Sequence, residues 1–386
     1  MAFLQEMRRT YIVVAILFTL AGAVVVSRRK ASAPLSIEQA KPVAADANFG
    51  TAATSNTATA QRLALLRPTH VVRGSNEALP ASTNLIARLV KGEGELPRIS
   101  RDQANAFALA NGRRASALLA AWRASGDKAF LDEAIEKFSN DPQVAFMAWS
   151  RSGVDKDSRD AEDAKREWLD KFKQAAPDNA LGDYLSARAH LRAGDLDAAL
   201  GELTAAGQKP WRDYSLDSIQ DVEEAYRSAG FSEAESKAIA SMGLLLPHLA
   251  ELRGLGKSLN ELAANRREIG DAASSDAASQ WALEIGQRIG RDGNMTLLQE
   301  LVSVAMQRDA LKAFDPNATL SSSGDTVQQR MASLDQQREA IRGVARDSGA
   351  IMSQLNEADL SAYFDRLKLF GEKAAVQWAK DRTENK

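Results

Sequence analysis

The longest uninterrupted apolar run of the chain lies near its start, at residues 11–27. Its seventeen positions read YIVVAILFTLAGAVVVS and carry no charge. As a helix that rises about 1.5 Å per residue, the run would be about 25 Å long, close to the roughly 30 Å hydrocarbon thickness of a bilayer. Arg8 and Arg9 before it and cations at 28–30 after it can reach the headgroups. The pattern predicts a single transmembrane helix.

Two other interpretations of this run stay open. Residues 31–33, Ala-Ser-Ala, have the small-x-small form of a signal-peptide cleavage site, although three cations separate them from the run and Pro34 would begin the cleaved chain. A buried core helix is the other, but it would carry a polar face. We expect an uncleaved anchor. The flanking cations are nearly balanced, so the orientation follows only the general tendency of such anchors to export the body. The expected location is a single-pass membrane protein with its body on the periplasmic side.

Beyond this run, the apolar positions recur every three or four residues, and long β-branched runs with period two are missing. Small and polar residues at 28–60 cannot bury enough surface to fold, which predicts a flexible linker. The expected fold class is all-α. The expected organisation is a short N-terminal tail (1–10), the transmembrane helix (11–27), the linker (28–60), irregular short helices (61–99), helical repeats (100–255), a further helix pair (256–324) and a C-terminal hairpin of long helices (325–386).

Local signals mark several helix boundaries. Ser100 and Ser232 are each followed three residues later by Gln or Glu, the capping-box pattern. Pro247 suits a first helical position, and Asn356 begins the last helix. That helix carries one apolar stripe, and the long helix before it carries another, so we expect the two to form an antiparallel hairpin joined near 348–349. The two stripes consist of Leu360, Tyr363, Leu367, Phe370, Ala374 and Trp378, and of Val327, Met331, Leu334, Ile341 and Ala345.

A weak period of about 34 residues organises the middle of the chain. Pro142, Pro177 and Pro210 lie 35 and 33 residues apart, and residues 184–210 read YLSARAHLRAGDLDAALGELTAAGQKP. This stretch resembles a degenerate tetratricopeptide repeat, and the resemblance covers roughly residues 120–215. The match departs from the family in the first helix, where Ser186 and Ala187 replace a large residue and a glycine.

The resemblance implies a role for each marked position. Gly194 allows the turn between two helices, Ala199 lets the paired helices approach, Leu203 packs against the neighbouring repeat, and Pro210 ends the second helix. Stacked helix pairs of this kind form a solenoid with a concave face, on which a partner helix or extended peptide binds. An irregular α–α solenoid or bundle is the alternative.

Composition excludes several chemistries. The chain has no cysteine, which rules out disulfides, thiolate metal sites and a cysteine nucleophile. Its net charge of -2 gives no reason to expect nucleic acid as a partner. The three histidines, His70, His190 and His248, are not at metal-ligand spacing. We therefore expect no catalytic, cofactor-binding or metal-binding residues, no cofactor and no enzymatic activity.

Two partial motifs do not change this expectation. Residues 256–258, Gly-Lys-Ser, end a phosphate-loop pattern whose first glycine is replaced by Glu251. The acidic residues at 155–163 lack the glycine and the final glutamate of a calcium loop. Both are better explained as solvated helix or loop positions.

One helix face remains as a possible partner groove. Tyr184, Arg188 and Arg192 step by four residues and would line the concave side of a repeat. The predicted function is a membrane-anchored helical-repeat protein that mediates protein–protein interaction. Two alternatives stay open: an envelope-associated α/α-fold enzyme that acts on a polymer, and a structural protein that forms homo-oligomers through Leu360, Phe370 and Trp378 of the C-terminal hairpin.

Overall fold

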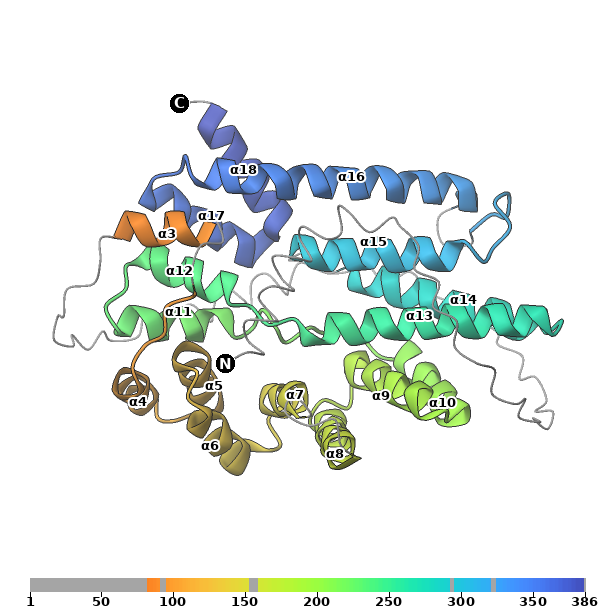
Figure 1. Ribbon diagram of the computed structural model, residues 1–386, viewed down its shortest axis with the longest axis horizontal. Coiled ribbons are helices and arrows are strands. Elements are labelled where there is room, and N and C mark those ends of the chain that lie inside the picture. Colours follow the sequence, from red (N-terminus) through yellow and green to blue (C-terminus); the bar gives the residue numbers. More distant parts are fainter. Residues whose placement is uncertain (1–81, 91–94, 153–158, 292–294, 321–323, 385–386) are drawn as a thin grey trace. The chain divides into compact units, whose positions relative to one another are not determined.

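The computed structural model divides the chain into two units, Met1–Val71 and Val72–Lys386. The residues that the structure describes, 82–90, 95–152, 159–291, 295–320 and 324–384, all belong to the second unit. They form a succession of helices (Figure 1). The helices are α3 (Ser82–Val90), α4 (Arg101–Ala110), α5 (Ala115–Ser125), α6 (Lys128–Phe138), α7 (Pro142–Arg151), α8 (Arg159–Ala175), α9 (Ala180–Ala193), α10 (Leu196–Gly207), α11 (Ile219–Ser228), α12 (Glu233–Met242), α13 (Pro247–Glu268), α14 (Ala272–Ile289), α15 (Leu297–Leu311), α16 (Val327–Met352), α17 (Glu357–Phe370) and α18 (Glu372–Glu384).

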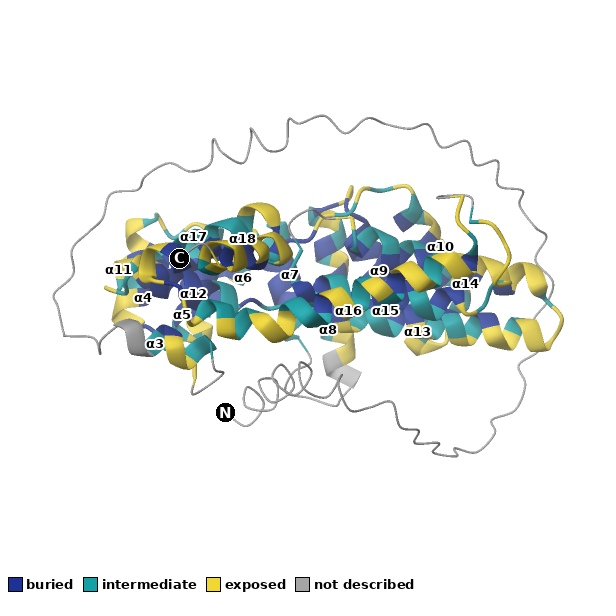
Figure 2. Ribbon diagram, turned by 90° about the horizontal axis from the view of Figure 1, so that it is seen from above, coloured by how far each residue is buried: buried dark blue, intermediate teal, exposed yellow. Residues whose placement is uncertain are grey.

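The helical character of the body is confirmed. In the described ranges, β pairing is limited to one isolated antiparallel bridge between Thr319 and Thr326. Apolar residues that recur with the 3.6-residue period of a helix lie on one face of each helix, and this face is buried. Figure 2 shows the exposed positions as stripes along individual helices. In α16, for example, only Val327, Leu334 and Ile341 are buried.

The membrane part of the fold and location predictions is corrected. The fold class included a single transmembrane helix, and the predicted location was a single-pass membrane protein with a periplasmic body. Among the helices that the structure describes, none combines the length and the apolar character needed to cross a bilayer. The predicted span, residues 11–27, and the linker after it lie outside the described residues. The function proposed below does not include membrane attachment.

The local capping signals are confirmed as helix starts. The Ser100 hydroxyl accepts the backbone N–H of Gln103, whose side chain accepts the Ser100 N–H in return. Ser232 makes the same reciprocal pair at the start of α12, and Asn356 caps α17. Pro247 is the first residue of α13, where its missing N–H has no helical partner to lose. These signals succeed because each involves only one turn of backbone.

Consecutive helices pack in pairs across residues 115–207. α5 packs on α6, α7 on α8, and α9 on α10. The first and last pairs turn at a left-handed glycine, Gly126 and Gly194, each followed by an aspartate that caps the next helix. After the third pair, the Pro210 carbonyl accepts the Ala180 N–H. Consecutive helices therefore pair across this range, while the repeat itself and membership of the tetratricopeptide family stay predictions.

The second half of the body is built around α13. This helix continues through Gly254 and Gly256 for 22 residues and packs against α9, α14 and α15. α15 packs in turn against α16. The main hydrophobic cluster runs through α4–α16 and includes buried leucines of α13, among them Leu252, Leu255 and Leu259. Contact between α9 and α13 brings the repeat region against this second half.

The C-terminal region differs from the predicted hairpin. The last helix is broken at Gly371, whose φ of 84° is a left-handed conformation, so that α17 and α18 pack on each other. α17 packs on α12 and α18 on α16. A second hydrophobic cluster forms here from α3, α12, α17 and α18, and includes Tyr363, Phe364 and Val376. The break turns α18 away from the line of α17, so two separate helices replace one long helix.

Candidate functional site

A cavity of about 310 Å³ lies between α7, α8, α9 and α13. Its lining combines an apolar part with six charged side chains. Trp149 of α7 is almost fully buried and stacks on Phe146, with ring centroids 5.5 Å apart, so one wall is rigid. The complete lining is Trp149, Glu162, Lys165, Arg166, Leu169, Leu185, Arg188, Ala189, Arg192, Ala193 and Glu251.

The lining follows from helical geometry. On α9, the lining residues Leu185, Arg188 and Arg192 recur at three- and four-residue steps, which place them on one face of the helix. On α8, Lys165 and Leu169 are four residues apart and share a face in the same way. The small side chains of α9 that line the cavity leave space between the helices.

Glu251 of α13 lies among three cations of the cavity. One of its carboxylate oxygens is 2.8 Å from Lys165 Nζ and 3.7 Å from Arg192 Nη1. The other is 3.8 Å from Arg188 Nε. About a fifth of the Glu251 side chain is exposed, and Lys165 and Arg188 are similarly covered. Partial burial reduces screening by water, so these interactions are stronger than those of surface pairs.

Arg188 is held deep in the wall but keeps donor capacity. Its Nη1 donates to the Ser258 hydroxyl of α13 at 2.7 Å. Its Nε is buried and has no hydrogen-bond acceptor, because the nearest Glu251 oxygen is beyond hydrogen-bond distance. Burial lowers the pKa of Arg188; Glu251 opposes this change, and the charge of Arg192 adds to it. The positive charge of Arg188 is thus only partly compensated.

The lining carries more cations than carboxylates. Lys165, Arg166, Arg188 and Arg192 face Glu162 and Glu251, which leaves two positive charges in excess. Arg192 and Glu162 pair at 3.1 Å, and both are well exposed. Within the described ranges, Arg166 is exposed and has no ion pair. In a chain whose net charge is -2, this cavity is a local positive region.

The structure separates the three predicted groove residues. Arg188 and Arg192 both line the cavity. Tyr184 does not line it: the side chain is 2% exposed and its ring centroid is 6.3 Å from that of Trp211. Burial raises the pKa of Tyr184, and the charge of Arg288 opposes this change. Tyr184 is a core residue.

Sequence reasoning missed the residues that other helices bring to the cavity. Trp149, Lys165 and Glu251 are not among the residues that the sequence predicts for a site. One signal was present on α13, where residues 248, 251, 254 and 258 follow each other at three- and four-residue steps. They include a histidine, a glutamate, a glycine and a serine, which is an unusual face for a helix that packs on several neighbours.

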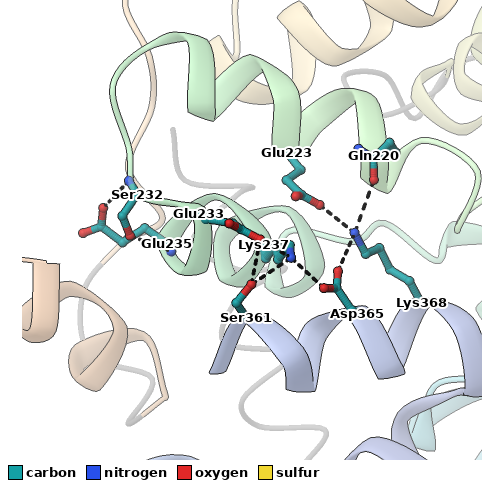
Figure 3. A network of polar contacts seen from close by, with 9 residues as sticks. All are labelled: Gln220, Glu223, Ser232, Glu233, Glu235, Lys237, Ser361, Asp365 and Lys368. Atoms are coloured by element: carbon teal, nitrogen blue, oxygen red, sulfur yellow. Dashed lines mark hydrogen bonds and ion pairs between the residues drawn. The ribbon is translucent and has the colours of Figure 1, made fainter. Parts of the chain in front are cut away.

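A second polar cluster fastens α17 to α11 and α12 (Figure 3). Lys237 Nζ lies 2.7 Å from carboxylate oxygens of Glu233 and of Asp365, although the lysine side chain is only 5% exposed. Lys368 Nζ lies 2.7 Å from the buried Glu223. Burial opposes the charge of Lys237, but its hydrogen bonds to Asp365 and Glu233 raise its pKa. Each cation already has a carboxylate partner, so this cluster is a structural link between helices.

A third group lies wholly in the core. His248 Nε2 of α13 is 3.1 Å from an oxygen of Asp213, and both side chains are at most 2% exposed. Asp213 also accepts the Gln299 amide at 2.7 Å and the Ser215 N–H at 2.8 Å. Burial opposes ionisation of Asp213, but the charge of His248 and the Ser215 hydrogen bonds hold its pKa below the usual value. Both side chains are buried in the core, so the group serves packing.

The part of the chain that the structure describes contains no cluster of three or more side chains suited to hold a metal ion. Comparison with known proteins finds no matching family model, no similar curated protein and no similar solved structure. The basic cavity is therefore the candidate site on its geometry and charge alone.

Proposed function

We propose that this chain is a helical scaffold for protein–protein interaction and that an acidic segment of the partner binds in the basic cavity between α7, α8, α9 and α13. The observation that carries the proposal is the excess of two cations among the side chains that line it. Guanidinium groups present several N–H donors in a plane and suit carboxylates well. A partner segment with acidic side chains matches both the charge and the donors.

The apolar part of the lining supports a peptide ligand. Trp149, Leu169 and Leu185 are buried residues that also line the cavity. An acidic segment with a neighbouring apolar side chain would place its charge on the cations and its apolar group against this wall. Binding sites commonly combine an apolar floor with a few placed polar groups.

Binding fits the lining better than catalysis. Arginine is permanently protonated at neutral pH, so it attracts anions rather than transferring protons. Three of the four cations of the cavity are arginines. The tetratricopeptide resemblance, which implies peptide binding on stacked helix pairs, adds to the proposal.

The alternative of self-association requires a different surface from the predicted one. Phe370 is 59% exposed and Leu369 is 43% exposed, at the end of α17. Leu360 is buried in the second cluster, and Trp378 is half-buried with the Arg366 guanidinium 4.3 Å from its ring centre. The predicted surface of Leu360, Phe370 and Trp378 is therefore corrected, because Phe370 alone of the three is classed as exposed.

Site-specific cross-linking in the full chain tests the proposal. A photo-reactive amino acid replaces the exposed Glu162 at the cavity, which leaves all four cations in place, and in a control chain it replaces Leu109 of α4, which is 58% exposed. We expect a protein adduct from position 162 alone, and mass spectrometry should map the cross-link to an acidic segment. Adding Arg188→Glu and Arg192→Glu should remove the adduct. An adduct that survives both changes, or the same adduct from position 109, would refute the proposal.

A further inference from the structure

Glu251 occupies the place that an anionic ligand would take. Its carboxylate is within 4 Å of Lys165, Arg188 and Arg192, which are three of the four cations in the cavity. The carboxylate comes from α13, whereas the cations come from α8 and α9. It therefore acts as a counter-ion supplied from across the cavity, and it keeps the cations together while the cavity holds no ligand.

The contacts of Glu251 are uneven. Only the contact with Lys165 at 2.8 Å is a hydrogen bond, while those with Arg188 and Arg192 are 3.8 and 3.7 Å. Arg188 Nε is buried without an acceptor at hydrogen-bond distance. The two arginines are attracted to Glu251 without being fully satisfied by it, so a better-placed carboxylate can replace it at lower cost than it could break a saturated pair.

The charge balance sets the charge of the ligand. Two positive charges remain after Glu162 and Glu251 are counted against the four cations. A ligand group with two negative charges would neutralise the cavity. Two neighbouring carboxylates spread that charge over separate arginines, and an adjacent apolar side chain would use the wall at Trp149.

We infer that Glu251 is a displaceable internal counter-ion and that the ligand of the cavity is a peptide with two neighbouring carboxylates. This inference rests on the proposed function and specifies its ligand. On binding, the peptide carboxylates pair with Arg166, Arg188 and Arg192, and Glu251 keeps only its contact with Lys165. Glu251 thereby weakens the affinity for acidic segments, because ligand and glutamate compete for the same arginines and repel each other.

The test measures peptide affinity in the full chain. The probe is a fluorescein-labelled peptide, Gly-Glu-Glu-Leu-Gly, titrated by fluorescence anisotropy, with Gly-Gln-Gln-Leu-Gly as the uncharged control. Glu251→Gln should bind the acidic probe about tenfold more tightly than the original chain. Glu284→Gln is the matched control, since Glu284 pairs with Arg288 at 2.7 Å outside the cavity. An unchanged or weaker affinity in Glu251→Gln overturns the inference.

A second variant, Arg166→Gln, tests the inference independently if Glu251→Gln does not fold. Arg166 is exposed and has no ion pair in the described ranges. Arg166→Gln should therefore remove a contact with the peptide without changing the stability of the fold. It should weaken the acidic probe about tenfold and leave the circular dichroism melt unchanged. Equal affinities for Arg166→Gln and the original chain would also overturn the inference.

Two further experiments distinguish phosphate from paired carboxylates as the ligand, and the inference from the proposed function. Inorganic phosphate at the probe concentration should leave the probe bound; displacement at that concentration would overturn the assignment to paired carboxylates. If Glu251→Gln binds the probe more tightly but the cross-linker at position 162 yields no protein adduct, the inference is supported and the proposed function is refuted. The reverse result, a protein adduct with no effect of Glu251→Gln, refutes the inference alone.

Discussion

The guanidinium of Arg188 lies against α13 at Gly254. A Cβ atom at residue 254 would stand 2.9 Å from Arg188 Nε, closer than real Cβ atoms come to other atoms. Gly254 thus provides the space in which Arg188 crosses to Ser258. The glycine therefore has a packing reason inside a helix, which makes Gly254 a positioning residue for the cavity.

Gly254→Ala should therefore change ligand binding more than stability. The methyl group would push the flexible end of Arg188 away from Ser258, and the affinity for the acidic probe peptide should fall about three- to tenfold. Anisotropy titration checks this result. Gly343→Ala of α16 is the matched control, because a Cβ there meets no atom within 4 Å. The control should keep its probe affinity and gain about 0.5–1 kcal/mol of stability from the better helix former. Equal probe affinities in the two variants would contradict the positioning role of Gly254.

Lys237→Met should loosen α17 from α12. The lysine side chain is 5% exposed and separates the carboxylates of Glu233 and Asp365, as Figure 3 shows. Without the ammonium group, two carboxylates face each other, and the free energy of unfolding should fall by about 1–3 kcal/mol. Urea denaturation measures the loss, and hydrogen exchange should accelerate in α17.

The matched control for that experiment is Lys257→Met. Lys257 pairs with Glu261 at 3.6 Å, and both side chains are mostly exposed. Its replacement should alter the free energy of unfolding by less than about 0.5 kcal/mol. If both lysine variants lost the same free energy of unfolding, the buried network would not be what holds α17 against α12.

Asp213→Asn should destabilise the core strongly. The aspartate accepts hydrogen bonds from Gln299 and the Ser215 N–H, and lies 3.1 Å from His248 Nε2. An asparagine would place an amide N–H₂ group against one of these donors, and we expect a loss of about 2–4 kcal/mol in urea denaturation. Asp309→Asn, which removes only an exposed pair with Lys312, should cost less than about 0.5 kcal/mol. A small effect at residue 213 would show that the buried group is dispensable.

Glu372 should make stability depend on pH. Its carboxylate accepts the Leu297 N–H at 2.8 Å. Burial raises its pKa above the usual value, the Leu297 hydrogen bond opposes this change, and the charge of Glu300 adds to it. The folded state therefore holds this proton more tightly than the unfolded state. Its contribution to stability is full below the unfolded pKa, near 4.5, and is lost as the pH rises through the raised folded pKa.

Glu372→Gln tests this dependence. The glutamine keeps an oxygen for the Leu297 N–H and removes the charge of this partly buried side chain. We expect the variant to be more stable than the original chain at pH 7 and the difference to shrink toward pH 4.5, as followed by urea denaturation at several pH values. A difference that stays constant across this range would exclude Glu372 as the titrating group.

Short-range features of this fold could be predicted from the sequence. Ser100, Ser232 and Asn356 mark helix starts correctly because capping involves only one turn of backbone. The break at Gly371 was missed because the apolar stripe continues across it. Only the packing of α17 on α12 and of α18 on α16 shows that the two halves of the stripe face different partners.

The cavity was predictable only in part. Arg188 and Arg192 were found because they are one helical turn apart on a single face. Tyr184 lies on the same face of α9, four residues before Arg188. Because all of residues 180–187 are buried, the spacing of polar and apolar residues does not show which side of this half of α9 faces solvent. Glu251 and Trp149 reach the cavity from helices that are distant in sequence, and no local pattern reports such a contact.

α12 has its two faces in different hydrophobic clusters. Ala234 and Ala238 belong to the smaller cluster with α17 and α18, whereas Ile239 and Ala240 belong to the larger one. Cores that are buried separately can open separately. We therefore expect the C-terminal helices to open and close as a unit of their own while the rest of the body stays folded. Slowest amide exchange would be confined to the helices of the larger cluster.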